Sequence, residues 1–483
     1  MESTKWSDEQ LKIFEWFSGG EGNLVVKARA GTGKTTTIKA AFEVAPEPEM
    51  LYAVFNKKNQ VEAQAKIVDP RVTVKTLHGV GFGFILQNWP GSKPDGFVER
   101  DRVQGNDTNL PTEVVTAACK AVGFAKNQFC DVPELAQLIE IIKQRGIDVS
   151  EDLEDCGWNE VKIAQLALRG LNASLRQDSR KRISFDDMVW LPVAMKWARP
   201  RYDLVVVDEA QDMNLPQLIM ATKADREGGR VCVVGDDRQA IYGFRGAVQD
   251  GIALMIERLN AKVLPLTITY RCPKRIVALA ADIVPDYRAA DAAPEGEVRD
   301  AVVEEIMGEV EAGDAILSRK NAPLMGLCLS LLRQGIPARI EGRDIGLMLT
   351  KIVEKLKARS VPQLLQKLCK WSERQTKRAL ISGNEAQAQS IEDQFLTLQA
   401  VAEGAASVRE VTDRLKELFA DSKDGSEVCC VVLSTIHKAK GLEWDRVFVL
   451  EDTFRKDAEG EEANIRYVAY TRAKRTLVRT SDR

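Results

Sequence analysis

The sequence has few of the residues that build metal cages or disulfide frameworks. It contains two histidines, and its nine cysteines include no pair with the CxxC spacing of zinc and iron–sulfur sites. Scattered cysteines of this kind are typical of a reducing compartment rather than of secretion. These features argue against a zinc or iron–sulfur protein and against a disulfide-rich extracellular one.

Long apolar runs and a charge of one sign are also missing. No run approaches the roughly 18 apolar residues of a membrane-spanning helix, and the first residues, MESTKWSDEQ, do not resemble a signal peptide. We therefore expect a soluble, cytoplasmic protein without a membrane partner. Because 68 Lys and Arg are balanced by 71 Asp and Glu, giving a net charge of −3, binding to nucleic acid would need a local basic groove or fixed N–H and aromatic contacts.

What the sequence does contain is a glycine-rich turn between a predicted strand and a predicted helix. The apolar run 24–26 leads into ARAGTGKTT at 28–36, and a helix is expected over 35–42. This order is typical of the phosphate-binding loop of nucleotide triphosphatases, in which backbone N–H groups surround the phosphates. Lys34 is expected to reach the β- and γ-phosphates, and the Thr35 hydroxyl to bind Mg²⁺. The residues predicted to contact the nucleotide here are Ala30, Gly31, Thr32, Gly33, Lys34, Thr35 and Thr36.

A second motif places two acidic residues at the end of a buried strand. In YDLVVVDEAQD, residues 202–212, four apolar residues precede Asp208 and Glu209. A parallel strand would deliver Asp208 to the edge of the sheet, where it can hold Mg²⁺ through water. Glu209 is positioned to accept a proton from the attacking water. A further strand, VCVVGDD at 231–237, precedes Gln239, which could orient that water or sense the γ-phosphate.

Aromatic and basic residues follow this second group of strands. Tyr242 and Phe244 flank a glycine beside Arg245, which suggests a base-stacking platform, although a buried aromatic turn has the same pattern. Tyr270 could stack on adenine, and Arg271 could pair with phosphate.

Two other polar residues have both a structural and a functional interpretation. Gln10 is either a solvated helix residue or an amide that reads the adenine edge. His78 lies just after a predicted strand at 72–74, where side chains of an open α/β sheet line the ligand face.

The order of predicted elements indicates an α/β fold with two lobes. Strand–loop–helix units occur before residue 90 and again from 180 to 275, and a mostly helical segment separates them. A second α/β region begins near 315, is interrupted by charge-rich helices over 349–421, and resumes with strands at 428–434 and 447–450 and a final helix and strand over 465–480. The plan suggests two α/β lobes with a nucleotide between them.

These motifs, taken in order, resemble those of superfamily 1 helicases of the UvrD/Rep type. The matching stretches are ARAGTGKTT, TLHG, VVVDEAQD, VVGDDRQAIYGFRGA, TYRCP, STIHKAKGLEWDRVFV and YVAYTRAKR. The resemblance implies two RecA-like P-loop NTPase lobes with parallel sheets, each carrying a mostly helical inserted subdomain. It predicts lobe 1A over 1–90 and 180–275, subdomain 1B over 91–179, lobe 2A over 276–345 and 425–483, and subdomain 2B over 346–424.

The resemblance also assigns roles to individual residues. It implies that Gln10 reads adenine, Tyr270 stacks on it, Glu443 contacts the ribose and Gln239 senses the γ-phosphate. It makes Lys34 the phosphate lysine, Thr35 and Asp208 the Mg²⁺ ligands, Glu209 the catalytic base, and Arg271 and Arg472 the two arginine fingers. The residues that fall in DNA-contacting motifs are His78, Tyr242, Phe244, Arg245 and His437.

The function implied is an ATP- and Mg²⁺-dependent helicase or translocase that moves along single-stranded DNA, 3′ to 5′, and acts at junctions with duplex. The alternative is a DNA-dependent ATPase that remodels or recruits proteins on DNA with little unwinding of its own, for which a protein partner is a further expectation. The short insertions leave both open. The stretch AVFNKKNQ, residues 53–60, lacks the threonine of the usual FTNKA and resembles F-box DNA helicases and some compact bacterial or phage relatives.

Two further classes fit the motifs less well. An RNA helicase of the same superfamily is less favoured because TIHKAKGLEW resembles the DNA branch. A nucleotide kinase would need an acceptor site, and it would not explain DEAQD together with two arginine fingers.

Overall fold

A computed structural model describes residues 6–145, 147, 153, 154, 157–241, 251–341, 343–381, 385–418, 430–455 and 460–481. The chain divides into two compact units, residues 1–267 and 268–483. The division comes eight residues before the end predicted for the first lobe at residue 275. The stretch TYRCP therefore lies in the second unit. The finer division into four subdomains stays a prediction.

The first unit is built on a six-stranded parallel sheet. Its strands, in spatial order, are β3 (Val72–Thr76), β2 (Met50–Val54), β6 (Tyr202–Val207), β7 (Asp225–Gly235), β1 (Leu24–Ala28) and β8 (Lys262–Leu266). All five residues of β2 are buried, as expected for a parallel strand covered on both faces. Since all six strands run the same way, the loops after β1, β6 and β7 meet at one edge.

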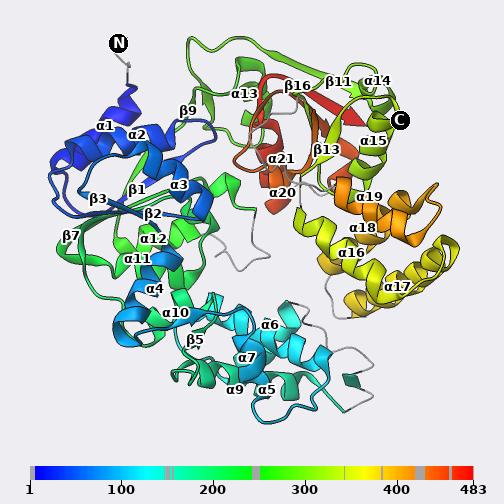
Figure 1. Cartoon of the computed structure of the whole chain (residues 1–483). Helices are drawn as coiled ribbons and strands as arrows, with labels where there is room; N and C mark the ends of the chain where they lie inside the picture. Colours follow the sequence, from blue (N-terminus) through cyan, green and yellow to red (C-terminus); the bar gives the residue numbers. More distant parts are fainter. Residues whose placement is uncertain are drawn as a thin grey trace. The chain divides into compact units, whose positions relative to one another are not determined.

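Helices cover both faces of this sheet (Figure 1). One face packs against α1 (Asp8–Gly19), α2 (Lys34–Val44) and α3 (Lys57–Lys66), and the other against α4 (Leu77–Asn88), α10 (Asp187–Ala194), α11 (Leu215–Thr222) and α12 (Gly251–Leu259). The start of α1 follows from a capping box, in which Ser7 and Gln10 each bond the other's backbone N–H. Asn56 caps α3 in the same unit, so this helix begins at Lys57.

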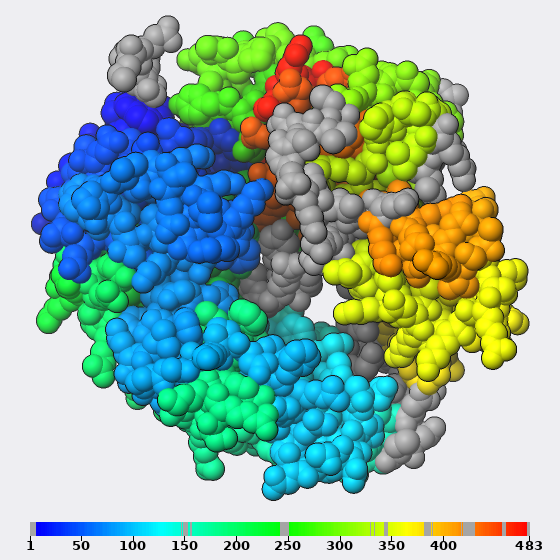
Figure 2. Space-filling model, viewed as in Figure 1, coloured from blue at the N-terminus to red at the C-terminus, as the bar shows by residue number. Residues whose placement is uncertain are grey.

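A mostly helical segment is inserted between β3 and β6. It contains α5 (Val98–Gln104), α6 (Thr112–Gln128), α7 (Leu135–Gln144) and α9 (Glu160–Ser174), with a short pair of strands, β4 (Lys93–Pro94) and β5 (Arg182–Ile183). These helices have their own hydrophobic core, which Ile85 of α4 and Trp190 of α10 join to the rest of the unit. In Figure 2 this segment, coloured blue to cyan and teal, forms the lower part of the first unit.

A buried group of charges fixes this helical segment to α10. Lys126 donates to Asp187 at 2.7 Å, Arg102 donates to the other oxygen of Asp187 at 2.5 Å, and both cations also pair with Glu99. Burial alone would raise the pKa of Asp187, but Lys126 and Arg102 outweigh it and hold that pKa below its usual value. Because each charge is compensated, the cluster specifies how α5, α6 and α10 pack.

The second unit contains another six-stranded parallel sheet. Its spatial order is β11 (Glu297–Val302), β16 (Ala473–Ser481), β15 (Trp444–Leu450), β12 (Ala315–Ser318), β14 (Val431–Thr435) and β13 (Ala338–Ile340). A two-stranded sheet of β9 (Ile268–Thr269) and β10 (Arg288–Ala289) precedes it. The two six-stranded parallel sheets confirm the predicted α/β fold class with two lobes of RecA-like type.

Helices of the second unit divide between the sheet and a helical segment. Those interleaved with the strands are α13 (Lys274–Ala281), α14 (Val303–Ile306), α15 (Asn321–Arg333), α20 (Ile436–Ala439) and α21 (Glu461–Tyr470). Between β13 and β14 come α16 (Arg343–Leu356), α17 (Val361–Ile381), α18 (Glu385–Ala402) and α19 (Val408–Leu418), coloured yellow to orange in Figure 1. Asp393 of α18 accepts from the backbone N–H groups of Asn321 and Ala322, which ties this segment to the start of α15. Within the described ranges, every helix is too short or too polar to cross a lipid bilayer.

Two glycines of α4 test how tightly the first unit is packed. A Cβ on Gly81 would lie 1.8 Å from the carbonyl oxygen of Met188, whereas one on Gly83 would meet no atom within 4 Å. We expect Gly81→Ala to lower the free energy of unfolding by about 3 kcal/mol or more, because the backbone of α10 must move. Gly83→Ala, the matched control, should raise it by about 0.5–1 kcal/mol through helix propensity. Urea unfolding followed by circular dichroism measures both, and equal stabilities would contradict the packing described.

Candidate nucleotide-binding site

The phosphate loop connects β1 to α2 at the carboxyl edge of the first sheet. Gly31 and Gly33 have φ values of 69° and 77°, a conformation that side chains with a Cβ rarely adopt. Gly33 is the N-cap of α2 and offers no side-chain oxygen to the first amides of that helix. The free N–H groups of the first turn, together with the positive end of the helix dipole, form a site suited to phosphate.

Lys34 forms an ion pair with Glu209, which follows β6. Its ammonium nitrogen lies 2.8 Å from Oε1 of Glu209, and both side chains are largely shielded from solvent. Burial works to lower the pKa of Lys34, but the charges of Glu209 and Asp208 raise it above its usual value. The structure therefore brings together the predicted phosphate lysine and the predicted catalytic base, 175 residues apart in sequence.

The backbone and a neighbouring amide hold Glu209 in place. Glu209 has φ 53° and ψ 42°, the left-handed region that non-glycine residues seldom occupy. Gln211 donates to its second carboxylate oxygen at 2.5 Å. A non-glycine residue in this region is strained by about 1–3 kcal/mol, and such strain is found mostly where function fixes a side chain.

Asp208, the last residue before this turn, is buried against β2. Its Oδ1 accepts from the backbone N–H of Glu209 at 2.9 Å, and its Oδ2 accepts from the hydroxyl of Tyr52 at 2.5 Å. Burial, followed by the charge of Glu209, raises the pKa of Asp208 above its usual range. A bound cation would reverse that effect by favouring the charged carboxylate.

The oxygen donors here fit Mg²⁺ bound together with a nucleotide. The hydroxyl of Tyr52 binds Asp208, and Thr35 lies near enough to influence the pKa of that hydroxyl, so Thr35 and Asp208 lie near one group. Among the described residues, no three His, Cys, Asp or Glu side chains are grouped so that they could hold a metal. Nucleotide-bound Mg²⁺ typically uses one or two protein oxygens and completes its shell with phosphates and water.

Asp236, at the end of β7, connects several of these groups. Arg29 of the phosphate loop donates to its Oδ1 at 3.0 Å, and Gln239 donates to its Oδ2 at 2.6 Å. The backbone N–H of Asp236 donates to Gln211. The predicted γ-phosphate sensor, Gln239, is therefore linked through one buried carboxylate to the phosphate loop and to the residue that holds Glu209.

Gln10 lies close to the phosphate loop, and its amide bonds within the protein. Its nitrogen donates to the Thr37 hydroxyl at 2.9 Å, and its oxygen accepts from the Ser7 backbone. Gln10 is buried, so the solvated-helix alternative is wrong. Its role toward adenine stays a prediction.

The second unit places four of the predicted nucleotide-contacting residues at the end of β9 and at the starts of β15 and β16. Arg271 pairs with Glu443 through Nε at 2.5 Å. The backbone N–H of Trp444 donates to the carbonyl of Arg472, and Cys272 contacts the carbonyl of Thr471. Tyr270, next to Arg271, leaves 53% of its surface exposed, as a residue that stacks on a ligand requires.

Arg472 differs from an exposed arginine finger because it is almost completely buried. Its guanidinium donates to the carbonyls of Val468 and Leu442 and to the Thr471 hydroxyl. Burial, together with the nearby charge of Arg271, lowers the pKa of Arg472 to about 10. The carbonyl oxygens satisfy the N–H donors of the guanidinium but do not neutralise its positive charge. A bound anion beside it would therefore be favoured.

Two of the five predicted DNA-contacting residues, His78 and His437, lie among the described residues. His78 lies in the first turn of α4, just past β3, and burial lowers its pKa. His437 lies in the short helix α20 after β14 and is half-buried. Tyr242, Phe244 and Arg245 lie outside the described residues.

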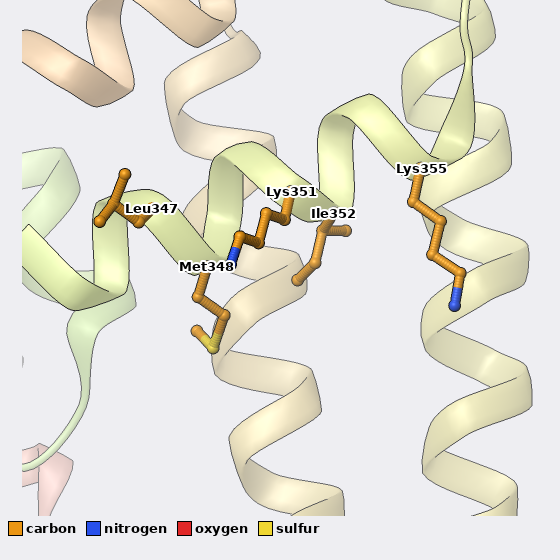
Figure 3. Close-up of a pocket in the computed structure, with 5 residues that line it drawn as sticks. All are labelled: Leu347, Met348, Lys351, Ile352 and Lys355. Carbon is orange, nitrogen blue, oxygen red and sulfur yellow. The ribbon is translucent and has the colours of Figure 1, made fainter. Parts of the chain in front are cut away.

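The hollows of the second unit involve other residues. One, of about 410 Å³, runs along α16 and is lined by Leu347, Met348, Lys351, Ile352 and Lys355 (Figure 3). Another, of about 550 Å³, lies at the carboxyl ends of β12 and β15 beside α15. No predicted nucleotide-contacting residue lines either one.

Three contacts of the site were not predicted from the sequence. Each contact involves a residue that the sequence does not predict to belong to the site: Tyr52, Arg29 and Gln211. A tyrosine within the otherwise aliphatic strand MLYAV and an arginine inside a phosphate loop were the available signals.

These features define the first unit as a P-loop nucleotide triphosphatase lobe, and comparison with known proteins gives the family. Residues 6–260 match the UvrD/REP helicase N-terminal domain, and residues 347–482 match the UvrD-like helicase C-terminal domain. The chain belongs to the UvrD/Rep family of superfamily 1 helicases, as the resemblance of its motifs predicted.

Proteins with similar sequences include eukaryotic and bacterial helicases. The chain is 24% identical to F-box DNA helicase protein 1 of Schizosaccharomyces pombe over 98% of its length, which covers 57% of that protein. It is also 24% identical to F-box DNA helicase 1 of Gallus gallus, over 99% of the chain and 49% of the relative. The ATP-dependent DNA helicase PcrA of Bacillus subtilis matches at 25% identity over 55% of the chain and 38% of PcrA. The chain thus spans about half the length of its F-box relatives.

Removing the Lys34 ammonium tests the site directly. Lys34→Ala should reduce ATP hydrolysis by on the order of 100-fold or more, because the substitution removes the fixed positive charge that stabilises the phosphates. Lys39→Ala, an exposed lysine of the same helix, is the matched control and should change hydrolysis less than about twofold. Phosphate release measured under saturating ATP distinguishes them, and equal rates for the two variants would contradict the assignment of this loop.

Proposed function

We propose that this protein is an ATP-dependent DNA helicase or translocase that moves along single-stranded DNA in the 3′-to-5′ direction. The observation that carries the proposal is that Lys34, Glu209 and Asp208 contact one another at the carboxyl edge of the first sheet. The chain also matches both the N-terminal and the C-terminal domain of the family. The relatives described above are named as DNA helicases, which supports DNA as the substrate.

The proposed chemistry assigns a separate task to each group. The amides of the first turn of α2 and Lys34 bind the phosphates of ATP, and Thr35 and Asp208 hold Mg²⁺. Glu209 accepts the proton of the attacking water after Lys34 transfers from its carboxylate to phosphate. Mg²⁺ supplies charge neutralisation on the phosphate oxygens.

Two arginines complete the proposed site. Arg271 and Arg472 of the second unit act on the nucleotide held by the first unit, so that hydrolysis depends on both units. Arg271 already pairs with the exposed carboxylate of Glu443, which the family resemblance assigns to the ribose. Since this pair is partly exposed, it contributes little to stability and can open when an anion binds.

DNA dependence is the experiment that tests the whole proposal. ATP hydrolysis should rise at least about tenfold with single-stranded DNA and much less with single-stranded RNA. Duplexes with 3′ or 5′ single-stranded tails then test direction, and the 3′-tailed substrate should be unwound. Hydrolysis stimulated by DNA without unwinding of either substrate would favour an ATPase that remodels or recruits proteins on DNA. No stimulation by either nucleic acid would contradict an autonomous motor.

Removing the predicted arginine finger should separate binding from hydrolysis. We expect Arg271→Ala to lower kcat about 1,000-fold while nucleotide affinity falls much less, since the charge acts mainly on the transition state. Arg275→Ala, an exposed residue of α13, is the matched control. Single-turnover hydrolysis and equilibrium binding of a fluorescent ATP analogue measure the two quantities. A parallel loss of affinity and rate would contradict the role of a finger.

A further inference from the structure

Tyr52 is a polar residue in the middle of a buried apolar strand. It is 1% exposed and lies between Val74 of β3 and Val206 of β6. Its ring packs edge-on against Phe42 of α2, with 5.7 Å between the ring centroids. Phenylalanine would fill the same space, so packing alone does not explain the hydroxyl.

The hydroxyl of Tyr52 is used at the edge of the nucleotide site. It donates to Oδ2 of Asp208 at 2.5 Å, and Thr35 lies near enough to influence its pKa. A tyrosine hydroxyl keeps its proton at neutral pH, so it acts as the donor to this carboxylate. One buried hydroxyl therefore binds one of the residues assigned to Mg²⁺ and lies near the other.

The position of the Asp208 carboxylate depends on two donors. The backbone N–H of Glu209 binds Oδ1 and the Tyr52 hydroxyl binds Oδ2, which together fix the rotation of the carboxylate. Mg²⁺ demands nearly octahedral geometry, so a ligand that rotates freely holds it less well. Groups that orient metal ligands typically change metal affinity about 10–100-fold when removed.

We propose that Tyr52 is a positioning residue that sets the Mg²⁺ affinity of the ATP site by holding the Asp208 carboxylate through its hydroxyl. The inference rests on the proposed function, because it takes Asp208 as a ligand of the nucleotide-bound Mg²⁺. It adds a residue of β2, from outside the phosphate loop and the acidic turn, to the groups that build the site.

The test measures nucleotide binding rather than turnover. Fluorescent mant-ADP is titrated into the whole chain, first in EDTA and then at increasing Mg²⁺, for wild type and Tyr52→Phe. We expect the Mg²⁺ concentration at half-maximal effect to rise about tenfold in the variant, while affinity in EDTA stays within about twofold. Electron paramagnetic resonance with Mn²⁺ and ADP should show correspondingly weaker Mn²⁺ binding.

Two further variants keep the test decisive. Tyr202→Phe removes the hydroxyl of another buried tyrosine, at the amino end of β6 in the same sheet, and should leave the Mg²⁺ dependence unchanged. Tyr52→Met also lacks the hydroxyl and should reproduce the shift, which covers the case that Tyr52→Phe does not fold. Thermal unfolding of each variant confirms that the fold is intact.

The outcomes distinguish this inference from the proposed function. A wild type that binds no mant-ADP overturns both. A wild type with Mg²⁺-dependent binding and a Tyr52→Phe variant with the same Mg²⁺ dependence overturns only the role of Tyr52. An equal loss of affinity with and without Mg²⁺, or the same shift in Tyr202→Phe, also overturns that role, because it would indicate a general packing effect.

Discussion

The ion pair between Lys34 and Glu209 is the interaction on which the site of the first unit depends. It joins the helix after β1 to the turn after β6, and it exists because a parallel sheet brings the ends of these strands to one edge. The pair keeps a buried ammonium charged and fixes the predicted base. A nucleotide phosphate would compete for the same ammonium, so binding of ATP and release of Glu209 are linked by charge.

Asp236 extends this constraint across the sheet edge. It accepts hydrogen bonds from Arg29 and Gln239, while its own backbone N–H bonds Gln211 and, through it, Glu209. The carboxylate is fully buried, and burial raises its pKa, while the charge of Arg29, followed by that of Lys34, favours the ionised form. A movement of the phosphate loop would therefore shift Asp236 and, with it, Gln239. Gln239 lies three residues before the segment predicted to stack on DNA bases.

The second unit contains two neighbouring arginines in different environments. It buries the guanidinium of Arg472 among backbone carbonyls and leaves Arg271 in a partly exposed pair with Glu443. Burial, followed by the nearby charge of Arg271, lowers the pKa of Arg472 to about 10. An anion beside the two arginines would oppose both effects.

Local sequence determined the phosphate loop, the acidic turn and most strands. Glycines at 31 and 33, a lysine after them and an aliphatic run before Asp208 each have a local physical reason, so the fold class and the place of these residues at one edge of the first sheet could be predicted. Only the tertiary structure decided that Tyr52 meets Asp208, that Arg29 meets Asp236, and that Arg472 is buried. These contacts depend on strand order and on side-chain packing between residues up to about 200 positions apart, which no local pattern encodes.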